Sequence, residues 1–133
     1  MKWGFIESWT KKPLFNARSE TILEKESFRK YYIENKCVVL ATAFYEYDEA
    51  HIRYEYSLNG QIIYMAGFYK KNEDGDDEYT IITQEAPPRY QHIHHRIPLI
   101  IKKEEVESYL KSIDDAEWLR PRNPTFKIVQ KLK

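Results

Sequence analysis

The sequence has little cysteine, no excess of charge and no long hydrophobic run, and each shortage excludes a class of protein. Cys37 is the single cysteine in 133 residues, which excludes an intramolecular disulfide framework and a multi-cysteine zinc site and fits a reducing compartment. The 21 Lys and Arg residues balance the 21 Asp and Glu residues, so global charge does not draw the chain to nucleic acid or to a membrane. No apolar stretch can span a bilayer, and the start MKWGFIESW lacks the apolar core of a signal peptide. We therefore expect a cytoplasmic chain in which any site for a polyanion is local.

Aromatic residues, by contrast, are plentiful. They make up 15% of the chain and include eleven tyrosines. Aromatic faces at a surface can stack on unpaired bases, although strand-rich sequences also carry many such rings.

The length favours one domain over 1–133, large enough to bury a core.

Hydrophobic periodicity predicts a mixture of strands and short helices. Apolar residues at helical spacing predict a helix over 27–36, with Ser27 as its N-terminal cap. The run CVVLATAFYE, 37–46, is apolar and β-branched and predicts one buried strand that ends at Glu46.

The second half of the chain predicts mostly strands. Residues 51–58 alternate, which places one face on the core, formed by Ile52, Tyr54, Tyr56 and Leu58. Asn59-Gly60 predicts a hairpin that returns the chain through 61–69. The remaining expected elements are a charged loop over 71–78, a strand over 79–83, a break at Pro87-Pro88, a strand over 97–101, helical segments over 104–111 and 114–119, and a strand over 125–129. We expect an α+β fold of mainly antiparallel strands in a barrel-like mixed sheet, with a few short helices.

The stretch FNARSET, 15–21, has a polar side chain at every second position. An extended backbone would alternate the side chains, giving a polar face of Asn16, Arg18 and Glu20 and a small, apolar face of Phe15, Ala17 and Ser19. One interpretation is an edge strand with a solvated outer face. The other is a row of ligand-binding side chains that suits a phosphate and a sugar. These residues leave both open.

The stretch QHIHHRIP, 91–98, holds three histidines within four residues. Zinc would need further ligands, and neither an HExxH motif nor a second cluster is present, so we expect no metal and no cofactor. An irregular segment with exposed histidines is one alternative. The other is a histidine that acts as an acid or base near neutral pH.

Glu46 is a third candidate because burial at the end of an apolar strand would raise its pKa and keep it partly protonated. Beside an imidazole, such a carboxyl would form an acid–base pair, whereas the simpler alternative is a glutamate at the rim of a hairpin. Cys37 opens a buried strand with no base nearby, which favours a core residue over a nucleophile.

Six stretches, taken in order, closely resemble successive motifs of the SOS response-associated peptidase family, the abasic-site processing proteins. They cover nearly the whole chain and are WGFIESW (3–9), FNARSET (15–21), CVVLATAFYEY (37–47), MAGFY (65–69), TIITQEA (80–86) and IHHRIP (93–98). The resemblance implies binding to abasic sites in single-stranded DNA. In this family an N-terminal cysteine, in some members exposed by self-processing, forms a covalent thiazolidine with the aldehyde of the lesion.

The resemblance also implies roles for individual residues. The catalytic residues would be Asn16, Glu46 and His94. The DNA-binding residues would be Trp3, Arg18, Ser19, Thr21, Arg29 and Arg96, with Arg18 and Arg96 on phosphates.

The sequence departs from the family pattern at its start and beside His94. The family has a cysteine and several dozen residues ahead of the tryptophan motif, whereas this sequence starts at Met1-Lys2-Trp3. Cys37 cannot replace that cysteine, because a thiazolidine needs the amine and the thiol of one residue. We expect an N-terminally truncated domain, either a fragment of a longer gene product or one half of a split protein whose complementary N-terminal polypeptide brings the cysteine. His95 stands where the family has aspartate, which removes a negative charge beside His94.

Several functions therefore compete. The first is an abasic-site processor derived from this family of autopeptidases. The second is a non-catalytic module that binds single-stranded DNA, and the third is a remnant without activity. A further alternative is a reversible Schiff base formed by the α-amine of Met1, which is partly neutral at pH 7.

Overall fold

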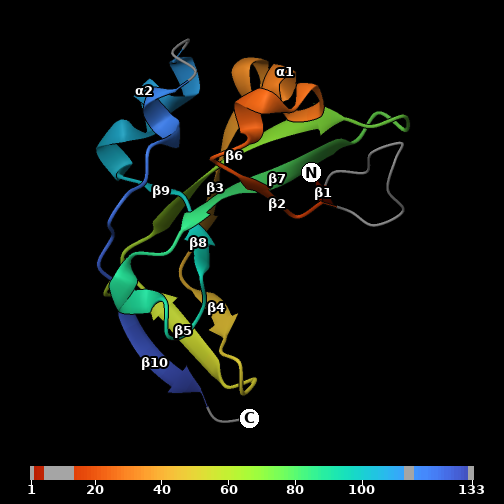
Figure 1. Ribbon diagram of the computed structural model, residues 1–133. Helices are drawn as coiled ribbons and strands as arrows, with labels where there is room; N and C mark the ends of the chain where they lie inside the picture. Colours follow the sequence, from red (N-terminus) through yellow and green to blue (C-terminus); the bar gives the residue numbers. More distant parts are fainter. Residues whose placement is uncertain (1, 5–13, 113–115, 132–133) are drawn as a thin grey trace.

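The computed structural model describes residues 2–4, 14–112 and 116–131. Within these ranges the chain forms a large mixed sheet, a small antiparallel sheet and two short α-helices (Figure 1). The predicted α+β class is therefore confirmed.

The large sheet has seven strands and runs in the order β1-β7-β6-β3, with β2 and β8 also on β7 and β9 on β6. β1 and β2 pair with β7 in parallel, and the other pairings are antiparallel. The strands are β1 (Lys2–Trp3), β2 (Asn16–Arg18), β3 (Lys36–Ala41), β6 (Ile63–Lys71), β7 (Asp77–Glu85), β8 (Arg96–Pro98) and β9 (Ile100–Ile101).

The small sheet has the order β10-β5-β4 and is antiparallel throughout. It consists of β4 (Phe44–Tyr47), β5 (Arg53–Ser57) and β10 (Lys127–Lys131). The α-helices are α1 (Glu26–Glu34) and α2 (Val106–Lys111), and the 3-10 turns are η1 (Ile22–Glu24), η2 (Pro88–Tyr90), η3 (Lys103–Glu105) and η4 (Glu117–Leu119). No helix in the described ranges is long and apolar enough to cross a membrane.

Two cores hold these layers together. The first lies between the large sheet and the helices, where Phe28 of α1 packs edge-on against Phe68 at 5.7 Å between ring centroids. The second joins the large sheet to the small one, where Tyr56 of β5 packs against Phe126 at 5.4 Å. Figure 1 shows α1 at one end of the molecule and β4 and β5 at the other.

The strand predicted over 37–46 is two strands that belong to different sheets. β3 ends at Ala41 and pairs with β6, whereas β4 begins at Phe44 and pairs with β5. The prediction of a single strand is wrong because both segments are apolar and the crossing, Thr42-Ala43, contains no glycine, proline or charged residue that would mark a break. The crossing carries Glu46 into the small sheet.

The Asn59-Gly60 turn is confirmed, but the hairpin predicted around it is wrong. Both residues have positive φ, 50° and 79°, as a type I′ turn requires, and a single bridge joins Leu58 to Gln61. Beyond that bridge β5 pairs with β4 and β10, while β6 pairs with β3, β7 and β9. The turn therefore connects the two sheets.

Smaller differences concern element ends. The helix predicted over 27–36 is α1, which starts at Glu26 and has Lys25 at its N-cap position, without a side-chain cap, in place of Ser27. The strand over 97–101 is divided into β8 and β9, and the helix over 104–111 is η3 followed by α2. The strand over 125–129 is shifted to β10, and part of the turn over 114–119 lies outside the described residues.

Candidate functional site

The structure brings Glu46 and His94 together. His94 Nε2 lies 3.3 Å from Glu46 Oε2, and the two side chains are 37% and 23% exposed. Glu46 comes from β4 and His94 from the segment between η2 and β8. Two residues 48 positions apart in the sequence thus form a half-buried pair at the edge of the second core.

Local packing explains where each partner points. On β4, Phe44 faces the second core and stacks on Tyr56 at 4.8 Å. Glu46 follows two residues later, so it lies on the same face of the strand. On the other side, Ile93 is buried in the second core, and the backbone N–H of His94 donates to the Tyr90 carbonyl at 3.2 Å. Each polar side chain is thus placed by an apolar residue next to it.

The electrostatics of the pair suit proton transfer near neutral pH. Burial raises the pKa of Glu46 to about 7, as the sequence predicts. The pKa of His94 is lowered below 6.5, first by burial and then by the charge of His95, whose ring lies 4.8 Å away. A hydrogen bond with the Tyr47 backbone has a smaller, opposing effect. The contact therefore joins an imidazole whose lowered pKa favours its neutral form to a carboxyl that exchanges its proton near pH 7.

The FNARSET ladder is confirmed around β2. Ala17 is buried in the first core and its neighbours Asn16 and Arg18 are exposed. Asn16 lies beside Ile81 and Arg18 beside Thr83 on β7. Among the described residues, no side-chain hydrogen bond or ion pair connects Asn16 or Arg18 to Glu46 or His94.

Phe15 does not follow the predicted apolar face. It precedes β2 and its side chain is 45% exposed. β2 begins at Asn16, and Phe15 stands just ahead of it, where its carbonyl accepts a hydrogen bond from the Ile81 N–H at 3.1 Å.

Arg96 is held by Glu20. Its Nη1 and Nη2 bind both oxygens of the Glu20 carboxylate, and Nη2 also donates to the carbonyl and the hydroxyl of Thr83 at 2.9 and 3.1 Å. The Arg96 side chain is only 12% exposed. Ser19 Oγ donates to Glu20 Oε1 at 2.9 Å, and Ser19 is buried. These contacts tie the turn after β2 to β8, a link that sequence reasoning missed because nothing marks a pair 76 residues apart.

The other predicted DNA-binding residues are dispersed. Thr21 follows the same turn, with its hydroxyl 3.5 Å from the Arg18 carbonyl. Arg29 is exposed on α1, which covers the first core, and so lies across the large sheet from β4. The backbone of Trp3 pairs with Tyr79 through β1, while its side chain lies outside the described residues.

Cys37 lies on β3 opposite Gly67, and burial raises its pKa to about 12. A thiol held in that form is a poor nucleophile. Within the described ranges, no group of three or more His, Cys, Asp or Glu side chains is arranged to hold a metal ion.

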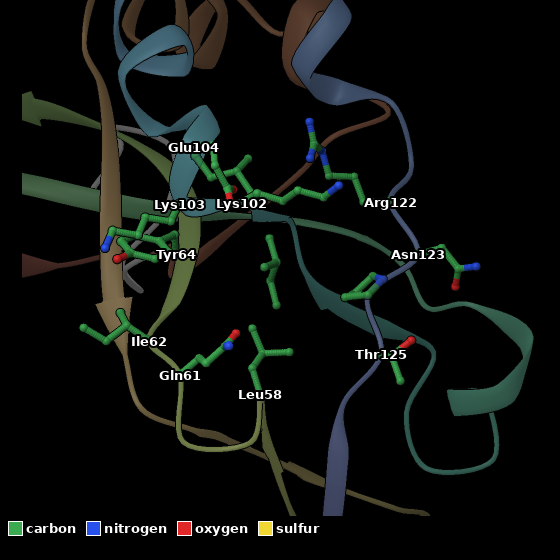
Figure 2. A pocket seen from close by; sticks show the side chains of 13 residues that line it. Leu58, Gln61, Ile62, Tyr64, Lys102, Lys103, Glu104, Arg122, Asn123 and Thr125 are labelled. Carbon is green, nitrogen blue, oxygen red and sulfur yellow. The ribbon is translucent and has the colours of Figure 1, made fainter.

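A cavity of about 800 Å³ lies apart from the Glu46–His94 pair. Figure 2 shows it between Leu58, Gln61 and Ile62 of the β5–β6 turn and the segment that carries Arg122, Asn123 and Thr125. None of the predicted site residues lines it. The chemistry of the half-buried pair therefore identifies the candidate site better than cavity size does.

Comparisons with known proteins show which family this chain resembles. The abasic site processing proteins YoqW and YoaM of Bacillus subtilis (strain 168) are each 31% identical to this chain, over 92% and 99% of it and over 57% and 60% of their own lengths. A crystal structure of a protein from Bacteroides thetaiotaomicron matches with a TM-score of 0.80 and 26% identity, over 96% of this chain and 66% of that one. The chain thus spans about three fifths of the length of these curated relatives.

The family model that matches is that of the SOS response associated peptidase (SRAP), over residues 1–130. The match extends over nearly all of the sequence and includes every residue of the site described above. This chain belongs to the SRAP family.

Proposed function

We propose that this chain binds abasic sites in single-stranded DNA, and that Glu46 and His94 transfer the protons of the reaction at the lesion. The observation that carries the proposal is the 3.3 Å contact between the two side chains, with a carboxyl whose pKa lies near 7. The names of the relatives, abasic site processing proteins, supply the substrate.

The chemistry of an abasic site needs such a pair. When an amine adds to the aldehyde, a carbinolamine forms, and its hydroxyl leaves as water only after it gains a proton. Protonated Glu46 is the donor for that oxygen, and neutral His94 takes the proton that the attacking amine loses. A general acid or base near its pKa contributes about 100-fold or more to such a step.

Residues at β2 would hold the strand. Arg18 is exposed, and its guanidinium can grip a phosphate with two parallel hydrogen bonds. Asn16, also exposed, would hydrogen-bond the reacting sugar. Arg96 is bound to Glu20, so a phosphate contact by Arg96 would require the two anions to share its guanidinium. Ser19 and Thr21 would act indirectly, through the turn that follows Arg18.

The amine and thiol that capture the aldehyde are not assigned to Cys37, which is internal and has a raised pKa. The test therefore supplies them as a synthetic peptide that begins with cysteine. An oligonucleotide with one abasic site is incubated with the peptide, with the chain, and with both, and adducts are followed over time by denaturing electrophoresis. The peptide without the chain gives the uncatalysed rate.

We expect the chain to accelerate adduct formation and Glu46→Gln and His94→Asn each to remove about 100-fold of that acceleration. Arg18→Gln should instead weaken binding to the oligonucleotide and make it less dependent on salt. A folded chain that binds the oligonucleotide but adds nothing to the rate of the peptide contradicts the catalytic part.

That outcome would favour the second candidate, a module that binds single-stranded DNA without chemistry. The partial burial of Cys37 and its raised pKa support this alternative, because they leave the chain's own thiol unreactive. A trapping experiment with borohydride and no peptide would separately test the α-amine of Met1.

A further inference from the structure

Tyr56 carries a buried hydroxyl with no hydrogen-bond partner among the described residues. Its side chain is completely buried, and its Oη makes no hydrogen bond. Two other buried tyrosines are satisfied: Tyr109 donates to the Gly67 carbonyl at 2.7 Å, and the Tyr90 hydroxyl contacts the Pro124 carbonyl at 3.2 Å. A buried hydroxyl without a partner costs stability, so its presence calls for an explanation.

The ring of Tyr56 is fixed in place. It stacks on Phe44 at 4.8 Å and packs edge-on against Phe126 at 5.4 Å and at a tilt against Tyr90 at 5.9 Å. With aromatic rings on these sides, the side chain cannot rotate its hydroxyl to solvent. The polar atom is therefore held in position by the packing of the second core.

That position is beside Glu46. On the β4–β5 ladder, Phe44 lies opposite Tyr56 and Glu46 lies opposite Tyr54. Glu46 and Tyr56 are thus diagonal neighbours on one face, a separation that long side chains can bridge. Burial first, and then the charge of Glu46, raise the pKa of Tyr56 to about 12, so the hydroxyl keeps its proton at neutral pH.

The other ionisable groups around this pair already have partners. The Tyr54 hydroxyl donates to the Asp48 carboxylate at 3.4 Å. His94 contacts Glu46 itself, and the ring of His95 packs against the ring of His94. Tyr90 Oη accepts from the backbone of Phe126 at 2.8 Å. Within this group of described residues, the Tyr56 hydroxyl is the donor left over.

We propose that Tyr56 is a positioning residue for Glu46: its hydroxyl is held in the core to donate a hydrogen bond to the Glu46 carboxylate, directly or through one water, when the carboxyl gives up its proton. A half-buried carboxylate without a donor would be costly. A fixed donor offsets that cost and orients the carboxyl for the next proton. The consequence for catalysis rests on the proposed function, whereas the effect on Glu46 does not.

The test measures the titration of Glu46 by carbon NMR of its carboxyl, with the signal assigned by its loss in Glu46→Gln. In Tyr56→Phe the ionised form loses its donor, so the pKa of Glu46 should rise by about half a pH unit or more. Tyr109→Phe is the matched control, because it removes a completely buried hydroxyl from the first core. It should leave the titration of Glu46 unchanged.

Thermal unfolding separates this role from a structural one. At pH 5, where Glu46 holds its proton, Tyr56→Phe should unfold at the same temperature as the wild type or higher, because it removes an unsatisfied group, whereas Tyr109→Phe should unfold at a lower temperature. An unchanged titration of Glu46 in Tyr56→Phe would overturn the inference. So would a drop in melting temperature at pH 5 as large as that of Tyr109→Phe.

The activity measurement tells the two proposals apart. If Glu46 shifts as expected but the wild-type chain does not accelerate adduct formation, the inference on Tyr56 holds and the proposed function fails. If the wild-type chain does accelerate it, the pH profile of Tyr56→Phe should move toward alkaline pH by the same amount as the NMR titration. If Tyr56→Phe instead keeps the pH profile of the wild type and the titration of Glu46 does not move, the proposed function stands and the role of Tyr56 is overturned.

Discussion

The guanidinium of Arg96 holds both carboxylate oxygens of Glu20, and this ion pair joins the turn after β2 to the start of β8. In the sequence, Arg18 stands two residues before Glu20 and His94 stands two residues before Arg96, so the contact joins the segments that carry them. It therefore fixes the candidate phosphate-binding residue relative to the acid–base pair. The pKa of Glu20 is lowered to about 2, mainly by the hydrogen bonds from Arg96 and to a smaller extent by the one from Ser19.

Replacing Glu20 should cost stability in a pH-dependent way. Because the pKa of Glu20 is lower in the folded chain than its ordinary value of 4.5, the pair stabilises the fold above about pH 5, and this contribution is lost as the pH falls toward 2. Glu20→Gln should lower the free energy of unfolding by about 1 kcal/mol at pH 7, a value reduced because half of the Glu20 side chain is exposed. Urea unfolding at several pH values would measure the difference from the wild type, which should shrink toward acid pH.

Glu107→Gln is the control for that experiment. Glu107 and Lys111 form an ion pair on α2 whose side chains are 78% and 75% exposed, so solvent screens it. Its loss should leave the free energy of unfolding almost unchanged. Equal effects of Glu20→Gln and Glu107→Gln would contradict a structural role for the Glu20–Arg96 pair.

Glu46 should have the opposite pH dependence. Its pKa is raised by burial from 4.5 to about 7, so the folded chain binds the proton more tightly than the unfolded chain, and stability falls as the pH rises through this window. Glu46→Gln keeps the shape of the neutral carboxyl and should be more stable than the wild type at about pH 8, by up to about 3 kcal/mol. Near pH 4 the two proteins should be equally stable. Parallel stability curves from pH 4 to 8 would show that Glu46 titrates normally.

Periodicity predicts segments well but not the partners that they choose. The alternation over 51–58 identifies β5, and Tyr54, Tyr56 and Leu58 pack into the second core as predicted, whereas Ile52 lies ahead of the strand and is not part of that core. The Asn59-Gly60 turn is also predicted correctly, yet the strands on either side of it join different sheets. A turn signal is local, whereas pairing depends on apolar surface that distant strands supply.

The site shows the same division. Burial of Glu46 and its raised pKa follow from its place in an apolar stretch, and the contact with His94 agrees with the hypothesis of a carboxyl beside an imidazole. The catalytic roles of both residues stay predictions. The partner of Arg96 and the unsatisfied hydroxyl of Tyr56 depend on the packed structure, so sequence patterns do not reveal them.

Gly67 should resist substitution because two strands approach it closely. It lies on β6 between Cys37 of β3 and Ile81 of β7, and a Cβ added there would lie 2.5 Å from the Thr80 carbonyl oxygen. Backbone cannot move away as a side chain can, so Gly67→Ala should cost about 2 kcal/mol in urea unfolding. Gly75→Ala, where φ is +85° and no atom lies within 4 Å, should cost only about 1 kcal/mol. A smaller loss at Gly67 than at Gly75 would mean that β6 and β7 can separate.

His95 should set the titration of His94. The two rings lie 4.8 Å apart, and the charge of His95 adds to burial in lowering the pKa of His94. His95→Asp places a carboxylate beside His94 and should raise the pKa of His94, while the neutral His95→Asn should raise it less. Proton NMR of the His94 ring would give the order wild type, His95→Asn, His95→Asp. Under the proposed function, His94 would then be more protonated at pH 7, so adduct formation should slow and recover at higher pH. Equal titrations in the wild type and both variants would show that the charge of His95 does not act on His94, which would leave burial as the cause of its lowered pKa.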